Sequence, residues 1–234
     1  IMDFLENWKE SKHRKPLILQ GARQVGKTYS VLEFGRKYYE NVAYFNFEMN
    51  PRLNKTFEEN ISPDYLIPIL SHIAGQTIIK EKTLIIFDEI QLCERALTSL
   101  KYFCEDAPDY HIIVAGSLLG VAVNRTKFSF PVGKVDLLHI YPLTFIEFLQ
   151  AADESIKAEC ITKQNWDILK SLSYQYEELL RQYYYVGGMP EAVSCFFATQ
   201  DLAAVRRIQR NILTGYQNDV CKHTQAQEVQ RILM

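Results

Sequence analysis

Eight residues near the beginning of the chain form a pattern that binds phosphate in many proteins. Residues 21–28 have the sequence GARQVGKT, which matches GxxxxGK[ST] at every fixed position. The glycines allow successive backbone N–H groups to converge on phosphate oxygens, and the helix that follows contributes the positive end of its dipole. The residues expected to bind the phosphates are Gly21, Ala22, Arg23, Gln24, Val25, Gly26, Lys27 and Thr28.

The last two residues of this loop have side chains suited to separate tasks. The ammonium group of Lys27 is expected to reach the β- and γ-phosphates and to act in catalysis. The hydroxyl of Thr28 is expected to bind Mg²⁺, because magnesium takes oxygen ligands and keeps several of its waters. The pattern therefore predicts a nucleoside triphosphate and Mg²⁺ as ligands.

Two carboxylates follow a short apolar run about 60 residues further along the chain. Leu84–Phe87 is predicted to be a buried strand, and Asp88 and Glu89 come directly after it. An acidic pair at such a place often only caps a helix. Together with the phosphate loop, the pair predicts Asp88 as a magnesium ligand, directly or through water, and Glu89 as the general base that activates a water for attack on the γ-phosphate.

Two further residues are candidates for catalysis, each with an alternative left open. Ser117 follows the apolar run His111–Ala115, where it would either sense the γ-phosphate or cap the next helix. Arg125 is the first candidate for the arginine that stabilises the transition-state charge, ahead of Lys134 and Arg181, although each could be an ordinary surface charge. Because no motif assigns such an arginine to the core, we expect efficient hydrolysis to need a second subunit.

The elements that position these residues alternate between apolar runs and helical patterns. Strands are predicted at Leu17–Leu19, Val42–Phe47, Leu84–Phe87 and His111–Ala115, and helices at Asp3–Lys12, Thr28–Tyr39 and Glu94–Phe103. Leu53–Ile79 is also expected to be helical, although Pro63 and Pro68 interrupt its pattern. This alternation predicts an α/β fold with a parallel sheet, helices on both of its faces, and ligands at the carboxyl ends of its strands.

The second part of the chain has a different character. Phe145–Ala152 and Asn165–Tyr185 have helical patterns, and Gly187–Pro190 marks the end of one helix and the start of the next. We therefore expect a core at residues 1–143, followed at residues 144–234 by a smaller helical module that is cut short at its end.

Composition narrows the environment and the partners. The 234 residues suffice for one α/β core and an appended module. A net charge of −2 gives no support for nucleic acid or an anionic membrane as a partner. The five cysteines include no CxxC pair, and no apolar run approaches the roughly 20 residues that span a bilayer. We expect a cytoplasmic protein with reduced thiols and no membrane contact.

Details of the sequence bear on the base and on polymeric partners. The guanine-binding pattern NKxD does not occur, so adenine and hence ATP are preferred. Trp8 is a candidate contact for the base, although packing explains it as well. The cluster Arg206, Arg207 and Arg210 could meet nucleic acid, whereas a solvated helix face is the ordinary explanation for it.

Several strings together resemble the prokaryotic AAA-type ATPases, related to AAA+ and STAND proteins, that carry a DUF4143 C-terminal region. These strings are GARQVGKT, FDEIQ, AGSLLGV, FPVGKV, YPLTFIEFL and GGMPEAV. The resemblance covers nearly the whole chain. It implies a P-loop NTPase core with strand order 5-1-4-3-2, a helical lid or winged-helix-like segment after it, and a further C-terminal domain mostly beyond Met234. Related ATPases commonly have arginine where this chain has Lys134, which puts a charge-sensing role there in doubt.

The function that these features favour is ATP hydrolysis, dependent on Mg²⁺, that drives a conformational switch. Glu89 is the residue that favours turnover over mere binding. The first alternative is a signalling or DNA-associated module that binds nucleotide with little turnover. The second is a small-molecule kinase, which the scarcity of arginine after Ser117 disfavours. The assembly of the chain into a homo-oligomer stays open.

Overall fold

The computed structural model describes residues 1–116 and 131–223, with side chains as far as residue 218. The described chain forms two compact units. The first contains residues 1–22 and 26–140, and the second contains the chain from Tyr141 onward together with Arg23–Val25. The chain passes from the first unit to the second between Ile140 and Tyr141, close to the domain boundary that we expect after residue 143. Among the described residues, no helix is both long and apolar enough to cross a membrane.

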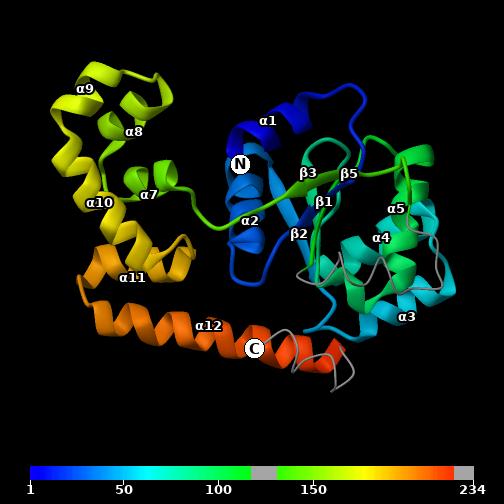
Figure 1. Ribbon diagram of the computed structural model, residues 1–234. Helices are drawn as coiled ribbons and strands as arrows, with labels where there is room; N and C mark the ends of the chain where they lie inside the picture. Colours follow the sequence, from blue (N-terminus) through cyan, green and yellow to red (C-terminus); the bar gives the residue numbers. More distant parts are fainter. Residues whose placement is uncertain (117–130, 224–234) are drawn as a thin grey trace. The chain divides into compact units, whose positions relative to one another are not determined.

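A five-stranded parallel sheet forms the centre of the first unit (Figure 1). Its strands are β1 (Leu17–Gln20), β2 (Asn41–Asn46), β3 (Thr83–Asp88), β4 (His111–Ala115) and β5 (Asp136–His139). Their order is β2-β3-β4-β1-β5, with parallel pairing throughout, which confirms the expected order 5-1-4-3-2 counted from the other edge. The register pairs Asp88 with Asn46 of β2 and with Ala115 of β4. The carboxyl ends of the strands therefore meet at one edge of the sheet.

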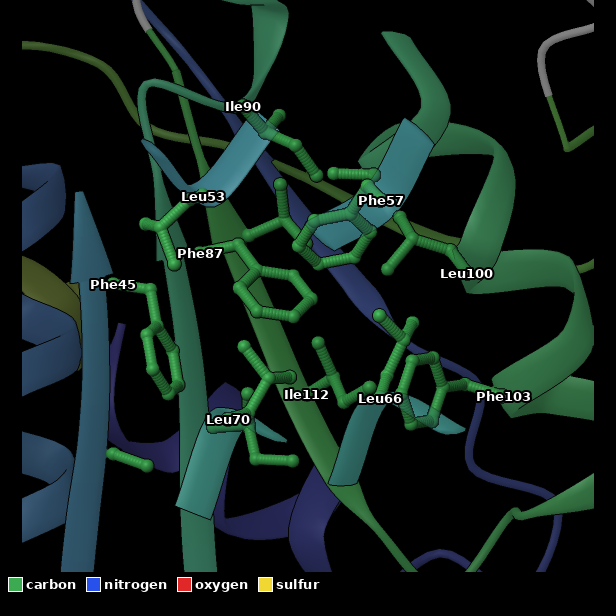
Figure 2. Packing of buried hydrophobic residues seen from close by; sticks show 14 of the residues in the cluster. Phe45, Leu53, Phe57, Leu66, Leu70, Phe87, Ile90, Leu100, Phe103 and Ile112 are labelled. Carbon is green, nitrogen blue, oxygen red and sulfur yellow. The ribbon is translucent and has the colours of Figure 1, made fainter. Parts of the chain in front are cut away.

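Helices cover both faces of this sheet, as the alternating pattern predicts. On one face lie α3 (Arg52–Glu59), α4 (Pro63–Ala74) and α5 (Glu94–Asp106), and on the other lies α2 (Lys27–Tyr38), beside α1 (Met2–Glu10) (Figure 1). Figure 2 shows the core between the sheet and the first three helices, where Phe87 of β3 lies against Phe57 of α3 with ring centroids 5.7 Å apart. Because β3 is covered on both faces, all six of its residues are buried.

The two prolines in the uncertain helical stretch have different effects. Pro63 occupies the first turn of α4, where its missing N–H costs nothing because that turn has no intrahelical acceptor for it. Pro68 lies inside α4 on an exposed position, and the helix continues through it to Ala74. The prolines therefore start one helix and interrupt none, because the apolar face of α4 packs against the sheet through Leu66 and Leu70.

The second unit consists of helices. They are α7 (Phe145–Ala151), α8 (Ser155–Thr162), α9 (Trp166–Ser171), α10 (Ser173–Val186), α11 (Pro190–Thr199) and α12 (Leu202–His223). A capping box of Thr144 and Glu147 begins α7. Buried Phe148, Val193 and Val205 join α7, α11 and α12 in one hydrophobic cluster. The predicted break at Gly187–Pro190 is confirmed, since α10 ends at Val186 and α11 begins at Pro190.

Two features of the fold were not apparent in the sequence. β5 is an edge strand whose residues alternate between half-buried and exposed, so it lacks the apolar run that marks the central strands. The expected single helix at Asn165–Tyr185 is two helices, with α9 ending at Ser171 and α10 beginning at Ser173. Leu172 and Leu169 of this junction pack against a small cluster around Tyr176, which fixes the bend.

A buried histidine lies at the amino ends of the strands, opposite the phosphate loop. His111, at the amino end of β4, shares a hydrogen bond of 2.7 Å with the hydroxyl of Tyr39 and packs edge-on against Trp8. The indole N–H of Trp8 donates to the carbonyl of Lys15 at 2.9 Å. Trp8 is therefore a packing residue at the amino ends of the strands, which is the ordinary explanation for it.

Burial, together with the smaller effect of the charges of Arg14 and Lys9, lowers the pKa of His111 to about 3. The unfolded chain therefore binds a proton at His111 at a higher pH than the folded chain does. Stability consequently falls as the pH drops from about 6.5 toward 3, and a shift of this size bounds the loss at about 5 kcal/mol.

Urea unfolding as a function of pH tests this effect. His111→Asn keeps a polar group near Tyr39 but cannot take up a proton, so the gap in stability between the wild-type protein and the variant should narrow on acidification. His13→Asn, at an exposed position, controls for the loss of a histidine as such. Parallel pH profiles for the wild-type and His111→Asn proteins would contradict the assignment.

A close backbone approach in the second unit makes a sharper prediction. The N–H of Leu143 donates to the carbonyl of Gly188 at 2.7 Å, and a Cβ atom at Gly188 would lie 2.2 Å from the carbonyl oxygen of Leu143. Gly188→Ala should therefore destabilise the protein by about 2 kcal/mol or more. Gly215→Ala is the matched control, because its added methyl meets nothing within 4 Å and should stabilise α12 by up to about 1 kcal/mol. Denaturation followed by helical circular dichroism measures both, and equal effects would refute the steric argument.

Candidate nucleotide-binding site

The phosphate loop connects the carboxyl end of β1 to the first residue of α2. Gly26 caps α2 with φ of 90°, a left-handed conformation that a side chain would strain. Gln24 also has a positive φ, of 64°, so the loop turns tightly between Gly21 and Gly26. The chain that follows enters a helix of 12 residues, whose amino end carries the partial positive charge that favours phosphate.

The ammonium group of Lys27 is held by the loop that contains it. Its Nζ donates to the carbonyl of Gly21 at 2.9 Å and to that of Ala22 at 2.6 Å, and only 7% of the residue is exposed. An ammonium group has three donors and no acceptor, and both of these carbonyls are neutral acceptors. Nucleotide phosphates at this loop would offer the lysine stronger, charged acceptors.

The carboxylate of Asp88 joins three segments of the chain at the edge of the sheet. Its Oδ2 accepts hydrogen bonds from the hydroxyl of Thr28 at 3.1 Å and from that of Tyr44 at 2.7 Å, while Oδ1 accepts from the N–H of Glu89 at 3.1 Å. The side-chain amide of Asn46 in turn donates to the Tyr44 hydroxyl at 3.2 Å. The loop, β2 and β3 are thereby tied to one carboxylate that is 5% exposed.

Tyr44 stays a hydrogen-bond donor at neutral pH. Burial first, and then the carboxylate of Asp88, raise the pKa of its phenol to about 12 against a lowering by Asn46. A tyrosine with this pKa keeps its proton and points it at Asp88. The side chain of Asp88 is therefore oriented by donors from β2, from α2 and from the residue that follows it.

Glu89 occupies an unusual backbone conformation directly after β3. Its φ of 53° is left-handed, a strained region for a residue with a side chain, and it begins the short helix η1 (Ile90–Leu92). Its Oε2 accepts a hydrogen bond from the amide of Gln91. The amide oxygen of Gln91 is buried and has no partner among the described residues. Gln91 thus holds the carboxylate of Glu89 through its amide nitrogen, while its amide oxygen can accept a further hydrogen bond.

These side chains suit a complex of phosphate with magnesium. The Thr28 hydroxyl and the Asp88 carboxylate are oxygen ligands 3.1 Å apart, of the kind that magnesium prefers. Two such groups are enough, because magnesium bound to phosphates usually keeps several waters. Lys27 and the amino end of α2 provide positive charge beside them. The arrangement is therefore chemically suited to a triphosphate, and Glu89 directly follows Asp88 along the chain.

The structure describes two of the four remaining candidate residues. Ser117 and Arg125 fall outside the described residues. Lys134 forms an ion pair of 2.9 Å with Glu105 of α5 just before β5 begins, at the amino ends of the strands and away from the phosphate loop. Arg181 belongs to α10 in the second unit. Lys134 is therefore not placed to stabilise negative charge at the phosphate loop.

Three residues of the site were not found by sequence reasoning. Tyr44 and Asn46 are two residues apart in β2, so their side chains lie on the same face of the strand. Their spacing in the sequence is the signal that could have shown this. Nothing in the strand pattern distinguished these polar positions from ordinary edge residues. Gln91 is part of the string FDEIQ, but only the folded turn brings its amide back to Glu89.

Solved structures share the fold. The Walker-type ATPase paby2304 of Pyrococcus abyssi is 16% identical, with a TM-score of 0.51 over 98% of this chain and 74% of that chain. The Drosophila ORC bound to DNA is 15% identical, with a TM-score of 0.48 over 91% of this chain and 66% of that chain. PCH-2 of C. elegans is 12% identical, with a TM-score of 0.45 over 92% and 67%. At such identities the likeness concerns the fold alone.

Two family models match separate parts of the sequence. Residues 177–234 match a family described as Domain of unknown function (DUF8612), which differs from the DUF4143 region implied by the resemblance. A comparison with curated proteins gives no significant match. Residues 13–149, which span β1 to α7 and include the phosphate loop, Asp88 and Glu89, match the family described as AAA domain. The chain belongs to the AAA domain family.

Proposed function

We propose that this protein binds ATP with Mg²⁺ at the phosphate loop and hydrolyses it, and that this reaction drives a conformational switch. The observation that carries the proposal is the convergence of Lys27, Thr28, Asp88 and Glu89 at one edge of the parallel sheet. Membership of the AAA domain family supports nucleotide binding at this place.

Binding would exchange partners around Lys27. The ammonium group would leave one or both of the carbonyls of Gly21 and Ala22 and donate to phosphate oxygens instead. An ionised phosphate oxygen attracts the ammonium group more strongly than a neutral carbonyl does, which favours this exchange. The backbone N–H groups at the start of α2 would add donors aimed at the same anion.

Magnesium bound with the nucleotide would neutralise charge on the phosphate oxygens. Thr28 would turn its hydroxyl oxygen toward the ion, and Asp88 would accept hydrogen bonds from waters around it or bind it directly. Tyr44 remains available to fix the orientation of Asp88 throughout, because its hydroxyl does not need to move. The chain thus keeps Asp88 in place while the partner of Thr28 changes.

Hydrolysis would use Glu89 as the general base. Its carboxylate would accept a proton from a water that attacks the γ-phosphate, and the products would be ADP and phosphate. The left-handed backbone at Glu89 and the hydrogen bond from Gln91 support a carboxylate held in one orientation. Residues Ser117 and Arg125 would complete the site as sensor and as arginine donor, the latter from a second subunit.

One observation favours a second candidate, a nucleotide-binding module with little turnover. The amide of Gln91 donates to Oε2 of Glu89, and this hydrogen bond occupies an oxygen that would otherwise be open to the attacking water. If Gln91 restrains Glu89 in this way, the protein would hold ATP until a partner releases the glutamate. Slow basal hydrolysis that rises in Gln91→Leu would support this candidate.

The test of hydrolysis compares Glu89→Gln with Asp88→Asn. Glu89→Gln should keep the affinity for MgATP and lower the turnover number by about 10²- to 10⁴-fold, because the amide has the same shape but cannot accept the proton. Asp88→Asn should instead weaken the dependence of binding on Mg²⁺. Phosphate release and calorimetric titration measure the two effects. Turnover at the wild-type rate in Glu89→Gln would reduce Glu89 to a helix cap.

A further inference from the structure

A group of arginines on α12 lines a cavity of the second unit. Ala203, Arg206, Arg207, Arg210 and Asn211 recur at the spacing of one helix face, and Tyr185 at the end of α10 completes the lining. The cavity measures about 520 Å³. We call this lining the arginine stripe. It lies wholly outside the residues assigned to nucleotide binding.

The arginine stripe is strongly positive in a chain that is slightly negative. Residues 202–218 of α12 contain three arginines and no acidic residue, whereas the whole chain has a net charge of −2. Within the described part of the chain, no carboxylate forms an ion pair with Arg206, Arg207 or Arg210. All three side chains are exposed. Their charge is therefore available to an anion.

Part of the arginine stripe is already fixed in position. The guanidinium of Arg206 lies over the ring of Tyr185 at 5.6 Å and donates to the side chain of Gln209 at 3.1 Å. The amide of Gln209 donates to the carbonyls of Tyr185 and Val186 at 2.8 Å and 3.0 Å, which ties α12 to the last turn of α10. The ring and the nearest arginine thus keep one geometry before any ligand arrives, which lowers the entropic cost of binding.

The chemistry of this surface fits phosphates and bases together. Guanidinium groups match phosphate oxygens with paired N–H donors, and exposed aromatic rings stack on bases. Tyr185 is 43% exposed, so part of its ring is open to a base, and Asn211 offers a donor and an acceptor. Along α10, Arg181 lies one turn before Tyr185 and extends the positive charge, while the carboxylates of Glu177 and Glu178 lie about two turns before it.

We propose that the arginine stripe binds single-stranded nucleic acid. Arg206, Arg207 and Arg210 would each contact a phosphate, and a base would stack against Tyr185 beside Arg206. The arginines alone would equally suit an acidic protein segment, but the carboxylates of such a segment do not stack on an open ring as a base does. A paired duplex is disfavoured because its bases are stacked on each other and cannot reach Tyr185. The proposal does not depend on ATP hydrolysis.

The experiment measures fluorescence anisotropy of a labelled oligothymidylate with the whole protein across a series of salt concentrations. Three phosphate contacts predict a log–log slope of about −2 for affinity against salt. The double variant Arg207→Gln/Arg210→Gln should lower affinity at least about tenfold and bring the slope to about −0.7. Lys170→Gln, which removes a positive charge from α9 outside the cavity, should leave both quantities unchanged.

Variants of Tyr185 separate stacking from charge. Tyr185→Ala should weaken binding by about 5- to 150-fold with the salt slope unchanged, and Tyr185→Phe should retain the wild-type affinity because it keeps the ring. Circular dichroism shows whether each variant stays folded. The proposal is overturned if the oligonucleotide does not bind, if the double arginine variant binds like the wild type, or if both Tyr185 variants bind like it.

Two competition results would also overturn the proposal. A duplex of the same length that binds as tightly as the single strand would show that no base is read by Tyr185. Polyglutamate that displaces the oligonucleotide as effectively as unlabelled oligothymidylate would show a surface for acidic protein segments instead. Preferential displacement by oligothymidylate is the expected result.

Discussion

The hydrogen bond between the Thr28 hydroxyl and the Asp88 carboxylate joins segments 60 residues apart, and the order of the strands makes it possible. β3, which ends in Asp88, is separated by β4 alone from β1, which leads into the phosphate loop. Parallel pairing across these strands brings their carboxyl ends to one edge. The proposed binding of phosphate and magnesium and the proposed hydrolysis all require these carboxyl ends to lie together.

Helices cover both faces of the sheet, and this burial makes the carboxyl ends of its strands rigid. The strand that presents Asp88 is buried along its whole length, and Phe87, directly before Asp88, packs among aromatic rings from β2 and α3 (Figure 2). Moving Asp88 would therefore disturb a close-packed core, which protein interiors resist. The hydrogen bond from Tyr44 then sets the orientation of the carboxylate on this fixed backbone.

Much of this arrangement could be predicted from the sequence, for physical reasons. The phosphate loop has a fixed spacing because backbone geometry around one anion is fixed, and buried parallel strands such as Leu84–Phe87 are continuous apolar runs. Tyr44 and Gln91 could not be predicted in the same way. Their roles depend on which side chain lies across a strand pair or a short turn, and such contacts leave no spacing rule in one sequence. The edge strand β5 escaped the pattern because one of its faces is open.

The central claim, that the phosphate loop binds ATP through Lys27, is tested most directly by isothermal titration of the protein with ATP and Mg²⁺. Lys27→Ala should weaken binding by about two orders of magnitude or more, equivalent to about 3 kcal/mol, because the anion loses its one point charge in the loop. Lys134→Ala is the matched control, since it removes a lysine that pairs with Glu105 at the other end of the sheet, and it should bind ATP like the wild type. An affinity of Lys27→Ala equal to that of the wild-type protein would contradict the account.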